Sequence, residues 1–391
     1  MRKAWVAGIA VAAIAASAAG AVWLQGRIFD QEFEAFAREM ADKGVLAGAL
    51  VNAEQTGRGF ARRDLSIGLR ASGLELRWTG SVRFGLGMTA RLSLDKTRGT
   101  MAELSGLGVE GLEDEIVVTK GLFAKRPEVT WRVKPFRLLS NDVLCSSGGF
   151  EFSSKDLERE GRALWQGLTC AQGAENVRVG EVMLEAAASA DGRRAEIRAT
   201  VAGAAADAAA LRVKTGAIEW EGTLEETRAE TAEDEALYAQ TSLFKAQNVD
   251  YDGERIFDAW TWRSRMTSVP ARLMEAVMFG DASGPVIVEA AAEEAIMQGG
   301  MTFDLDECTV MRNGSLLTVS GRIARDGQRL GALFVRMDPE FGADIKGWSQ
   351  GVEELKAGGR LRTVDGRLEA HVEFSTEGVV VNGVRLDSVN E

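Results

Sequence analysis

Apolar and polar residues alternate through most of this chain from residue 62 onward. Leu65, Ile67 and Leu69 alternate with polar residues or glycine, and the same period recurs in 74–78, 82–88 and 92–94, between glycine-containing breaks. A period of two is that of a β-strand with one buried face. The pattern therefore predicts a long antiparallel meander. Further strands are predicted at 115–119, 129–139, 176–186, 194–201, 210–225, 315–324 and 329–337.

Asp-Gly and Asn-Gly pairs mark tight hairpins, because both residues tolerate the positive φ angles of two-residue turns. Such pairs stand at 191–192, 313–314 and 326–327. Near the chain end, residues 368–374 alternate again, Gly378 permits a turn, and Asn382-Gly383 provides a second one. We therefore predict that the chain finishes on a closing strand of the sheet.

Helical patterns are fewer and fall at 155–168, 270–279 and 344–357, while 285–298 fits a strand or a helix. The fold class expected is mainly β (α+β), with long antiparallel sheets and a few packing helices. The acidic stretch 221–236 is interpreted as a solvated link, with a partly helical surface segment as the alternative. This places a first β-rich lobe at 46–225 and a second at 226–391.

The first 26 residues differ from the rest. Arg2 and Lys3 precede 21 uncharged residues, Ala4 to Leu24, and a helix of that length spans the roughly 30 Å hydrocarbon core of a bilayer. The leading cations predict a cytoplasmic N-terminus and an exported body. The expectation is a single-pass inner-membrane anchor. A cleaved signal peptide is the alternative, since small-x-small sites follow the apolar core.

The helix is expected to continue over residues 27–45 as a membrane-proximal amphipathic segment, whose apolar stripe is Phe29, Phe33, Phe36 and Met40. Within the apolar segment, small residues recur every four positions, a spacing that lets membrane helices approach closely. These are Gly8, Ala12, Ala16 and Gly20. The stripe and the small residues are together candidates for self-association, so a homo-oligomer is a possible state.

Three cysteines are compatible with an oxidising compartment. Cys145 and Cys170 lie 25 positions apart, and closing that loop would contribute roughly 3 kcal/mol. They are a candidate disulfide. Cys308 is then left over, and we interpret it as a small buried residue and not as a reactive thiol.

The residue inventory argues against catalysis, cofactors and nucleic acid. The one histidine, His371, alternates with glutamates on the polar side of a predicted strand, which favours a surface or ion-paired role. No His or Cys spacing suits a metal. Gly85, Gly87 and Ala90 imitate a dinucleotide turn, but a strand follows where that motif needs a helix. The net charge of -12 argues against nucleic-acid binding.

Trp260 and Trp262 lie two positions apart in "FDAWTWRSRM", beside Arg263 and Arg265. In a strand this spacing places both indoles on one face. These four residues are a candidate binding strip, with ordinary core packing as the alternative.

Three stretches resemble the YdgA-like proteins, a bacterial envelope family described as domain of unknown function 945. They are the "MRKAWVAGIAVAAIA" start with its helical continuation, the step at Arg58, Gly59 and Phe60 into the first long strands, and the end "AGGRLRTVDGRLEAHVEFSTEGVVVNGV". The resemblance implies one membrane anchor and a mostly β periplasmic body in a Gram-negative cell. It implies no catalytic residues.

Two functions of different class remain. The first is a non-enzymatic, anchored envelope scaffold or assembly factor that acts through protein interactions. The alternative is a β module whose sheet forms a hydrophobic groove for a lipid or lipoprotein, suggested by the nine Trp and sixteen Phe of the chain, many of which fall in the predicted strands.

Overall fold

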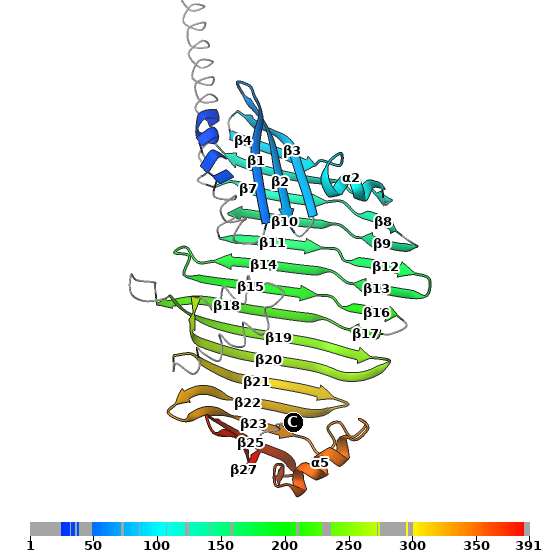
Figure 1. Ribbon diagram of the computed structural model, residues 1–391, viewed down its shortest axis with the longest axis vertical. Coiled ribbons are helices and arrows are strands. Elements are labelled where there is room, and N and C mark those ends of the chain that lie inside the picture. Colours follow the sequence, from blue (N-terminus) through cyan, green and yellow to red (C-terminus); the bar gives the residue numbers. More distant parts are fainter. Residues whose placement is uncertain are drawn as a thin grey trace, which may run out of the picture. The chain divides into compact units, whose positions relative to one another are not determined.

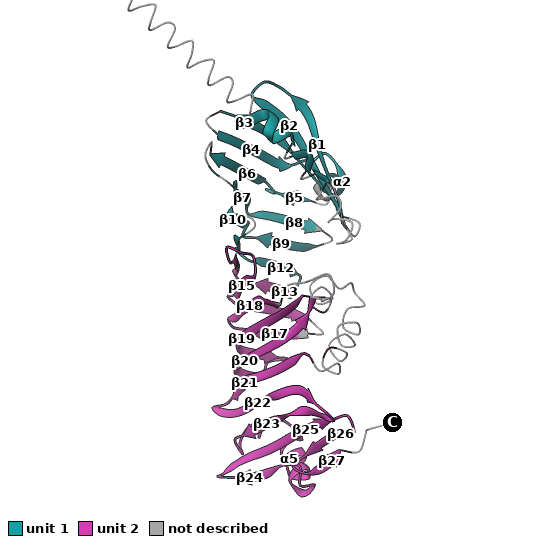
Figure 2. Cartoon of the chain, turned by 90° about the vertical axis from the view of Figure 1, so that its left-hand side faces the viewer, with its two compact units in different colours: residues 1–173 teal, residues 174–391 magenta. Residues whose placement is uncertain are grey.

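The computed structural model describes residues 25–31, 33–35, 37–38, 49–71, 74–85, 87–106, 108–121, 124, 126–140, 142–156, 159–208, 211–228, 236–271, 273, 295 and 300–386. The chain divides into two compact units, Met1–Gly173 and Ala174–Glu391 (Figure 2). The limit predicted at 225/226 instead falls inside a strand that is paired on both sides, since the first half of the acidic stretch, residues 221–228, belongs to β18.

Unit 1 is an antiparallel sheet with two ladders (Figure 1). One ladder follows the order β1, β2, β3, β4, β6, β7, β10, β11, and the other the order β5, β8, β9, β12. The bounds are β1 Ala49–Arg58, β2 Arg62–Ala71, β3 Leu74–Phe84, β4 Gly87–Leu94, β5 Val109–Glu110, β6 Asp114–Gly121, β7 Glu128–Val133, β8 Phe136–Ser140, β9 Val143–Ser147, β10 Phe150–Asp156, β11 Glu160–Trp165 and β12 Leu168–Gln172.

Unit 2 continues the antiparallel style. Its main ladder follows the order β14, β15, β18, β19, β20, β21, β22, β23, β25, β26, β27, and a second ladder follows β13, β16, β17, β19. The bounds are β13 Glu175–Val179, β14 Val182–Ala188, β15 Arg194–Val201, β16 Ala204–Ala208, β17 Leu211–Thr215, β18 Ile218–Arg228, β19 Leu237–Tyr251, β20 Glu254–Pro270, β21 Thr302–Arg312, β22 Ser315–Asp326, β23 Arg329–Met337, β24 Arg362–Val364, β25 Arg367–Ser375, β26 Gly378–Val381 and β27 Val384–Leu386.

A row of short breaks separates the two ladders in each unit. The predicted strands 129–139, 176–186 and 210–225 each form as two strands, interrupted at 134–135, 180–181 and 216–217. The breaks hydrogen-bond to one another, as from Gly148 N to Gly167 O at 3.0 Å and from Gly180 N to Gly203 O at 2.7 Å. At Gly149, where φ is 99°, a Cβ atom would lie 2.8 Å from Val133 O. Glycine is required there because neighbouring backbone fills the space.

The helix predicted at 155–168 is wrong. The residues from 150 to 172 form β10, β11 and β12, with a hairpin between β10 and β11 and a break at 166–167. The spacing of Leu164, Trp165 and Leu168 fits one helical face, yet β10 pairs with β7 and β12 with β9. These long-range pairings override the local helical pattern.

The described helices are short. α2 comprises Gly99–Gly106 and α5 comprises Trp348–Ala357, within the predicted range 344–357. Trp348 and Val352 of α5 pack on a core of Met337, Leu368 and other residues, whereas Ile345 and Leu355 are exposed. In the range 270–298, Pro270 ends β20, and the other described residues, 271, 273 and 295, are helical.

Residues 25–31, 33–35 and 37–38 are helical, as predicted for the segment after the apolar stretch. No helix built from described residues is long and apolar enough to cross a membrane. The apolar segment 4–24 lies outside those residues.

The closing strands form as predicted. Asn382 and Gly383 both have positive φ, 50° and 83°, in the two-residue turn between β26 and β27. Asn382 also joins the turn to neighbouring segments: its Oδ1 accepts the backbone N–H of His371 at 2.9 Å, and its Nδ2 donates to Arg360 O at 3.1 Å. Asn382 therefore contributes side-chain hydrogen bonds in addition to the positive φ angle that the turn requires.

Candidate functional site

One face of unit 2 carries two unbroken rows of apolar side chains. Directly paired residues of an antiparallel ladder lie on the same face, so the strand register defines each row. The first row is Ala199, Trp220, Phe244, Trp262, Cys308, Val319, Val335 and Ala370. The second row is Val201, Ile218, Ala246, Trp260, Val310, Leu317, Met337 and Leu368. We call these two rows the aromatic face.

The opposite face of the same strands is polar. The row between the two apolar ones is Thr200, Glu219, Lys245, Thr261, Thr309, Thr318, Arg336 and Glu369. Ion pairs cross it, with Lys245 Nζ 3.7 Å from Glu219 Oε2 and Arg336 Nε 2.8 Å from Glu369 Oε1. The two faces of the unit 2 sheet therefore differ, and apolar side chains form continuous rows on the aromatic face, whereas the opposite face carries charged and hydroxyl side chains with single apolar residues such as Phe334.

The rings of the aromatic face contact one another, and two of its three indoles donate their N–H groups to neighbouring serines, whereas Trp260 Nε1 is buried without a hydrogen-bond partner among the described residues. Phe244 and Trp260 meet edge to face with centroids 4.9 Å apart. Trp220 Nε1 donates to Ser242 Oγ at 2.9 Å, and Trp262 Nε1 donates to Ser264 Oγ at 3.0 Å. Because these indole N–H groups already have partners, the surface at Trp220 and Trp262 presents carbon.

Only part of this face is covered by described residues. At the β23–β25 end, α5 and its preceding turn bury Met337 and Leu368. At the C-terminal end of β20, Leu273 and Ala295 pack on Val269. Between them, the aromatic rings of β18, β19 and β20 are partly buried and belong to none of the cores that the described residues form. These are Trp220, Phe244, Trp260 and Trp262.

Unit 1 has its own apolar face. Its principal row is Leu65, Gly80, Leu92, Ile116, Trp131, Phe152 and Ala163. Here too the indoles are internally paired, since Trp78 Nε1 and Trp131 Nε1 both donate to Asp114 Oδ2, at 2.7 and 3.2 Å. The same construction of carbon-lined aromatic rows thus appears in both units.

The N-terminal helix covers the β2–β4 part of that face. Phe33 is buried in the core with Leu65 and Val82, and the Phe29 ring lies 5.6 Å from that of Phe84. Phe29 and Phe33 are therefore used within the chain, and the hypothesis that they mediate self-association is corrected: their apolar stripe faces the sheet. Phe36 and Met40, like Gly8, Ala12, Ala16 and Gly20, lie outside the described residues.

A buried ion pair fixes the helix to the sheet. Asp30 and Arg63 are only 8% and 6% exposed, and Arg63 Nε donates to Asp30 Oδ1 at 2.8 Å. Arg58 Nη2 donates to the other oxygen, Oδ2. Burial alone would raise the pKa of Asp30, but the hydrogen bonds from Arg63 and Arg58 outweigh it and lower that pKa. We call this arrangement the helix clamp.

The four residues of the predicted Trp-Arg strip do not share a face. Trp260 and Trp262 lie on the aromatic face, as their spacing predicted, but Arg263 and Arg265 pair with Leu243 and Thr241 on the polar face. The reason is the strand period, which separates neighbours to opposite faces. On the polar side, the two arginines line a hollow of about 540 Å³ together with acidic residues and threonines.

A second hollow on the polar face of unit 2, of about 910 Å³, surrounds the ring of Phe334. This ring is 59% exposed and stacks on His371 with centroids 4.4 Å apart. His371 also lies 4.0 Å from Glu373, between Nδ1 and Oε1. The sequence placed His371 on the polar side, but it gave no signal that an exposed phenylalanine would cover it.

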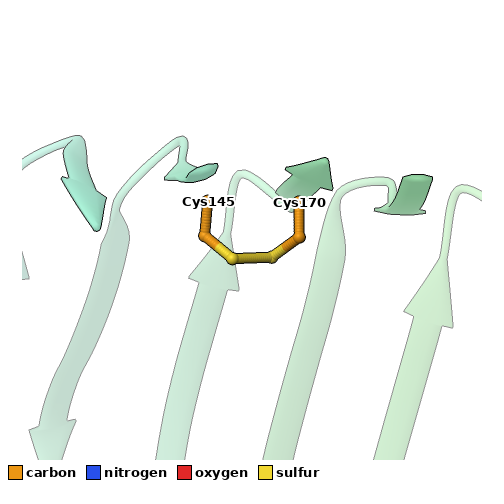
Figure 3. The surroundings of a disulfide bond; sticks show 2 residues. All are labelled: Cys145 and Cys170. Carbon is orange, nitrogen blue, oxygen red and sulfur yellow. A yellow bond between two sulfur atoms is a disulfide. The ribbon is translucent and has the colours of Figure 1, made fainter. Parts of the chain in front are cut away.

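The structure joins Cys145 to Cys170 in a disulfide (Figure 3). The two residues are direct partners of β9 and β12, with Cα atoms 4.0 Å apart. Cys308 is partly buried, and burial raises the pKa of its thiol. A protonated thiol is a poor nucleophile, which agrees with the interpretation of Cys308 as a packing residue in the aromatic face.

Comparisons with protein-family models, with curated proteins and with solved structures found no match. Membership of the YdgA-like family therefore stays a prediction.

Proposed function

We propose that this chain is a non-catalytic envelope protein, anchored in a bacterial inner membrane by its N-terminal segment, whose exported sheet binds an apolar chain of a lipid or lipoprotein. The observation that carries the proposal is the aromatic face of unit 2. Its two rows place apolar side chains on each of β18, β19 and β20. The rings among them are partly exposed, and aromatic rings grouped in this way on a folded domain suit an apolar ligand.

Two further observations support the location. The helix that follows the apolar segment is a buried part of unit 1, through Phe33 and the helix clamp. An anchor formed by residues 4–24 would then be continuous with the folded body. The disulfide between Cys145 and Cys170 suits an exported protein, because disulfides persist in oxidising compartments.

The ligand class follows from the surface. The indole donors of Trp220 and Trp262 are occupied by Ser242 and Ser264, so this part of the face selects for carbon and not for hydrogen-bonding groups. An acyl chain meets that requirement, and the membrane that holds the anchor would supply it.

Photo-crosslinking tests this proposal. The full chain is placed in lipid nanodiscs doped with a phosphatidylethanolamine that carries a diazirine at the end of one acyl chain, and crosslinked peptides are mapped. We expect crosslinks on residues 218–262 besides the apolar segment. Trp262→Ala should weaken them, whereas Trp262→Phe, which keeps an apolar ring, should retain them. Crosslinks confined to residues 1–31 would refute the proposal.

Phe334 provides the matched control, since Phe334→Ala removes an aromatic ring of the same unit from the opposite face. It should leave the lipid crosslinks unchanged. The exposed ring also favours a second candidate function, the protein-binding scaffold, because an exposed aromatic ring beside arginines is typical of interface hot spots. Loss of a co-purifying envelope protein in Phe334→Ala, together with absent acyl crosslinks, would favour that scaffold.

A further inference from the structure

The β1–β2 turn lies beside the start of the N-terminal helix. Asp30 of the helix binds Arg58 and Arg63, which flank this turn. Gly26 is so close to Arg63 that a Cβ atom there would lie 2.9 Å from Arg63 Nη2. Both views of the molecule show the β1–β2 hairpin ending at the same end of unit 1 as the start of the helix (Figure 1, Figure 2).

The turn presents an exposed apolar side chain. Phe60, the central residue of the turn, is 62% exposed. Ile28 on the adjacent helix is 43% exposed. The turn is well fixed, since Gly59 N donates to Arg62 O at 2.8 Å and Phe84 N donates to Ala61 O at 3.0 Å. A large apolar ring on this fixed tip is therefore mostly free of contacts with the described residues and is accessible to a partner.

Arginines stand two positions before and two positions after Phe60 in the chain. Arg58 and Arg62 have side chains 67% and 56% exposed. Arg62 is the direct cross-strand partner of Arg83, an arrangement that is unfavourable between like charges unless an anion lies nearby. Asp64 pairs with Arg62 at 2.8 Å, but within the described part of the chain Arg83 has no ion-pair partner. The β1–β2 tip, residues 58–62 with the facing Arg83, therefore combines an exposed apolar ring with excess positive charge.

The apolar segment ends at Leu24, one residue before the described helix begins. If that segment spans the bilayer, residues 25–28 lie at the headgroup level, and so does the guanidinium of Arg63, which lies against Gly26 and donates to the Gly59 carbonyl of the turn. Basic residues around an inserted aromatic ring are the composition of surfaces that bind anionic lipid.

We propose that the β1–β2 tip, through Phe60 with Ile28, Arg62 and Arg83, inserts into the headgroup layer of the same membrane and recognises anionic phospholipid. This second contact fixes the orientation of unit 1 on the bilayer. The inference rests on the membrane anchor of the proposed function, and it is independent of the aromatic face.

The test uses the full chain with Cys308→Ser, so that one introduced cysteine can carry an environment-sensitive fluorophore. The label is placed at Phe60→Cys, at Leu139→Cys as a control that is 55% exposed on β8 of the same unit, and at Ala12→Cys to report on the anchor. Nanodiscs contain phosphatidylcholine alone or a mixture with phosphatidylglycerol, and a lipid with a nitroxide headgroup serves as quencher.

We expect the label at position 60 to emit at shorter wavelength, and to be quenched more strongly than the label at position 139, in discs with phosphatidylglycerol. Replacing both Arg62 and Arg83 by Gln should remove the difference between the two lipid compositions. Quenching at position 60 no stronger than at position 139, with position 12 shielded from water, would overturn this inference and leave the anchor intact. A water-exposed label at position 12 would overturn the anchor itself.

Discussion

Removing the carboxylate of the helix clamp should release the N-terminal helix from unit 1. In Asp30→Asn, Arg63 stays 6% exposed with its charge unpaired. Breaking one side of a buried ion pair costs about 3–5 kcal/mol. Since 1.36 kcal/mol corresponds to a factor of ten, a loss of about 3 kcal/mol should make local opening, and the amide exchange that depends on it, about a hundredfold faster. We expect this acceleration in residues 25–38, measured by hydrogen exchange with the full chain in detergent micelles.

Asp64→Asn is the matched control. Asp64 pairs with Arg62 at 2.8 Å, but both side chains are well exposed, and such pairs contribute about 0–1 kcal/mol. The control should change the exchange of residues 25–38 by less than tenfold. A double variant, Asp30→Ala with Arg63→Met, should recover part of the loss because no buried charge remains. Equal effects of Asp30→Asn and Asp64→Asn would refute the argument that burial makes the clamp strong.

Three further predictions concern stability. Acid should open the clamp: the pKa of Asp30 is lowered from 3.8, so its stabilisation is present above that value and is lost as pH falls below it, seen as accelerated exchange of residues 25–38 below about pH 4. Asn382→Ala should destabilise unit 2 by about 2–3 kcal/mol in denaturant titrations. Asn382→Gly should lose nearly as much although it keeps the backbone angles, and an unchanged midpoint in both would contradict the side-chain role. Replacing Cys145 and Cys170 by serine should lower the stability of unit 1 by roughly 3 kcal/mol, whereas Cys308→Ser should change it much less; similar losses would count against the disulfide.

The strands and several turns were predictable because their signals are local. A period of two identifies a strand wherever one face is apolar, and Asn-Gly at 382–383 specifies its own backbone angles. The pairs Asp252-Gly253 and Asp365-Gly366 carry the same positive φ angles and could have been used to predict the turns that precede β20 and β25.

Other features depended on contacts that the sequence does not show. Asp30 and Arg63 are 33 positions apart, and no local pattern links them. Residues 155–168 fit a helical face, but pairing of their neighbours with β7 and β9 made them strands. Alternation alone would have separated Arg263 from Trp262, so the combined strip was an avoidable error.

Native mass spectrometry of the full chain, extracted from its membrane in mild detergent, asks whether the aromatic face holds a lipid. We expect a near-stoichiometric lipid bound to the intact protein, identified by extraction. We expect its loss in a variant with Trp220→Ser and Trp262→Ser that still unfolds cooperatively. A wild-type chain without bound lipid, or one whose lipid is retained in that folded variant, would contradict the proposed function.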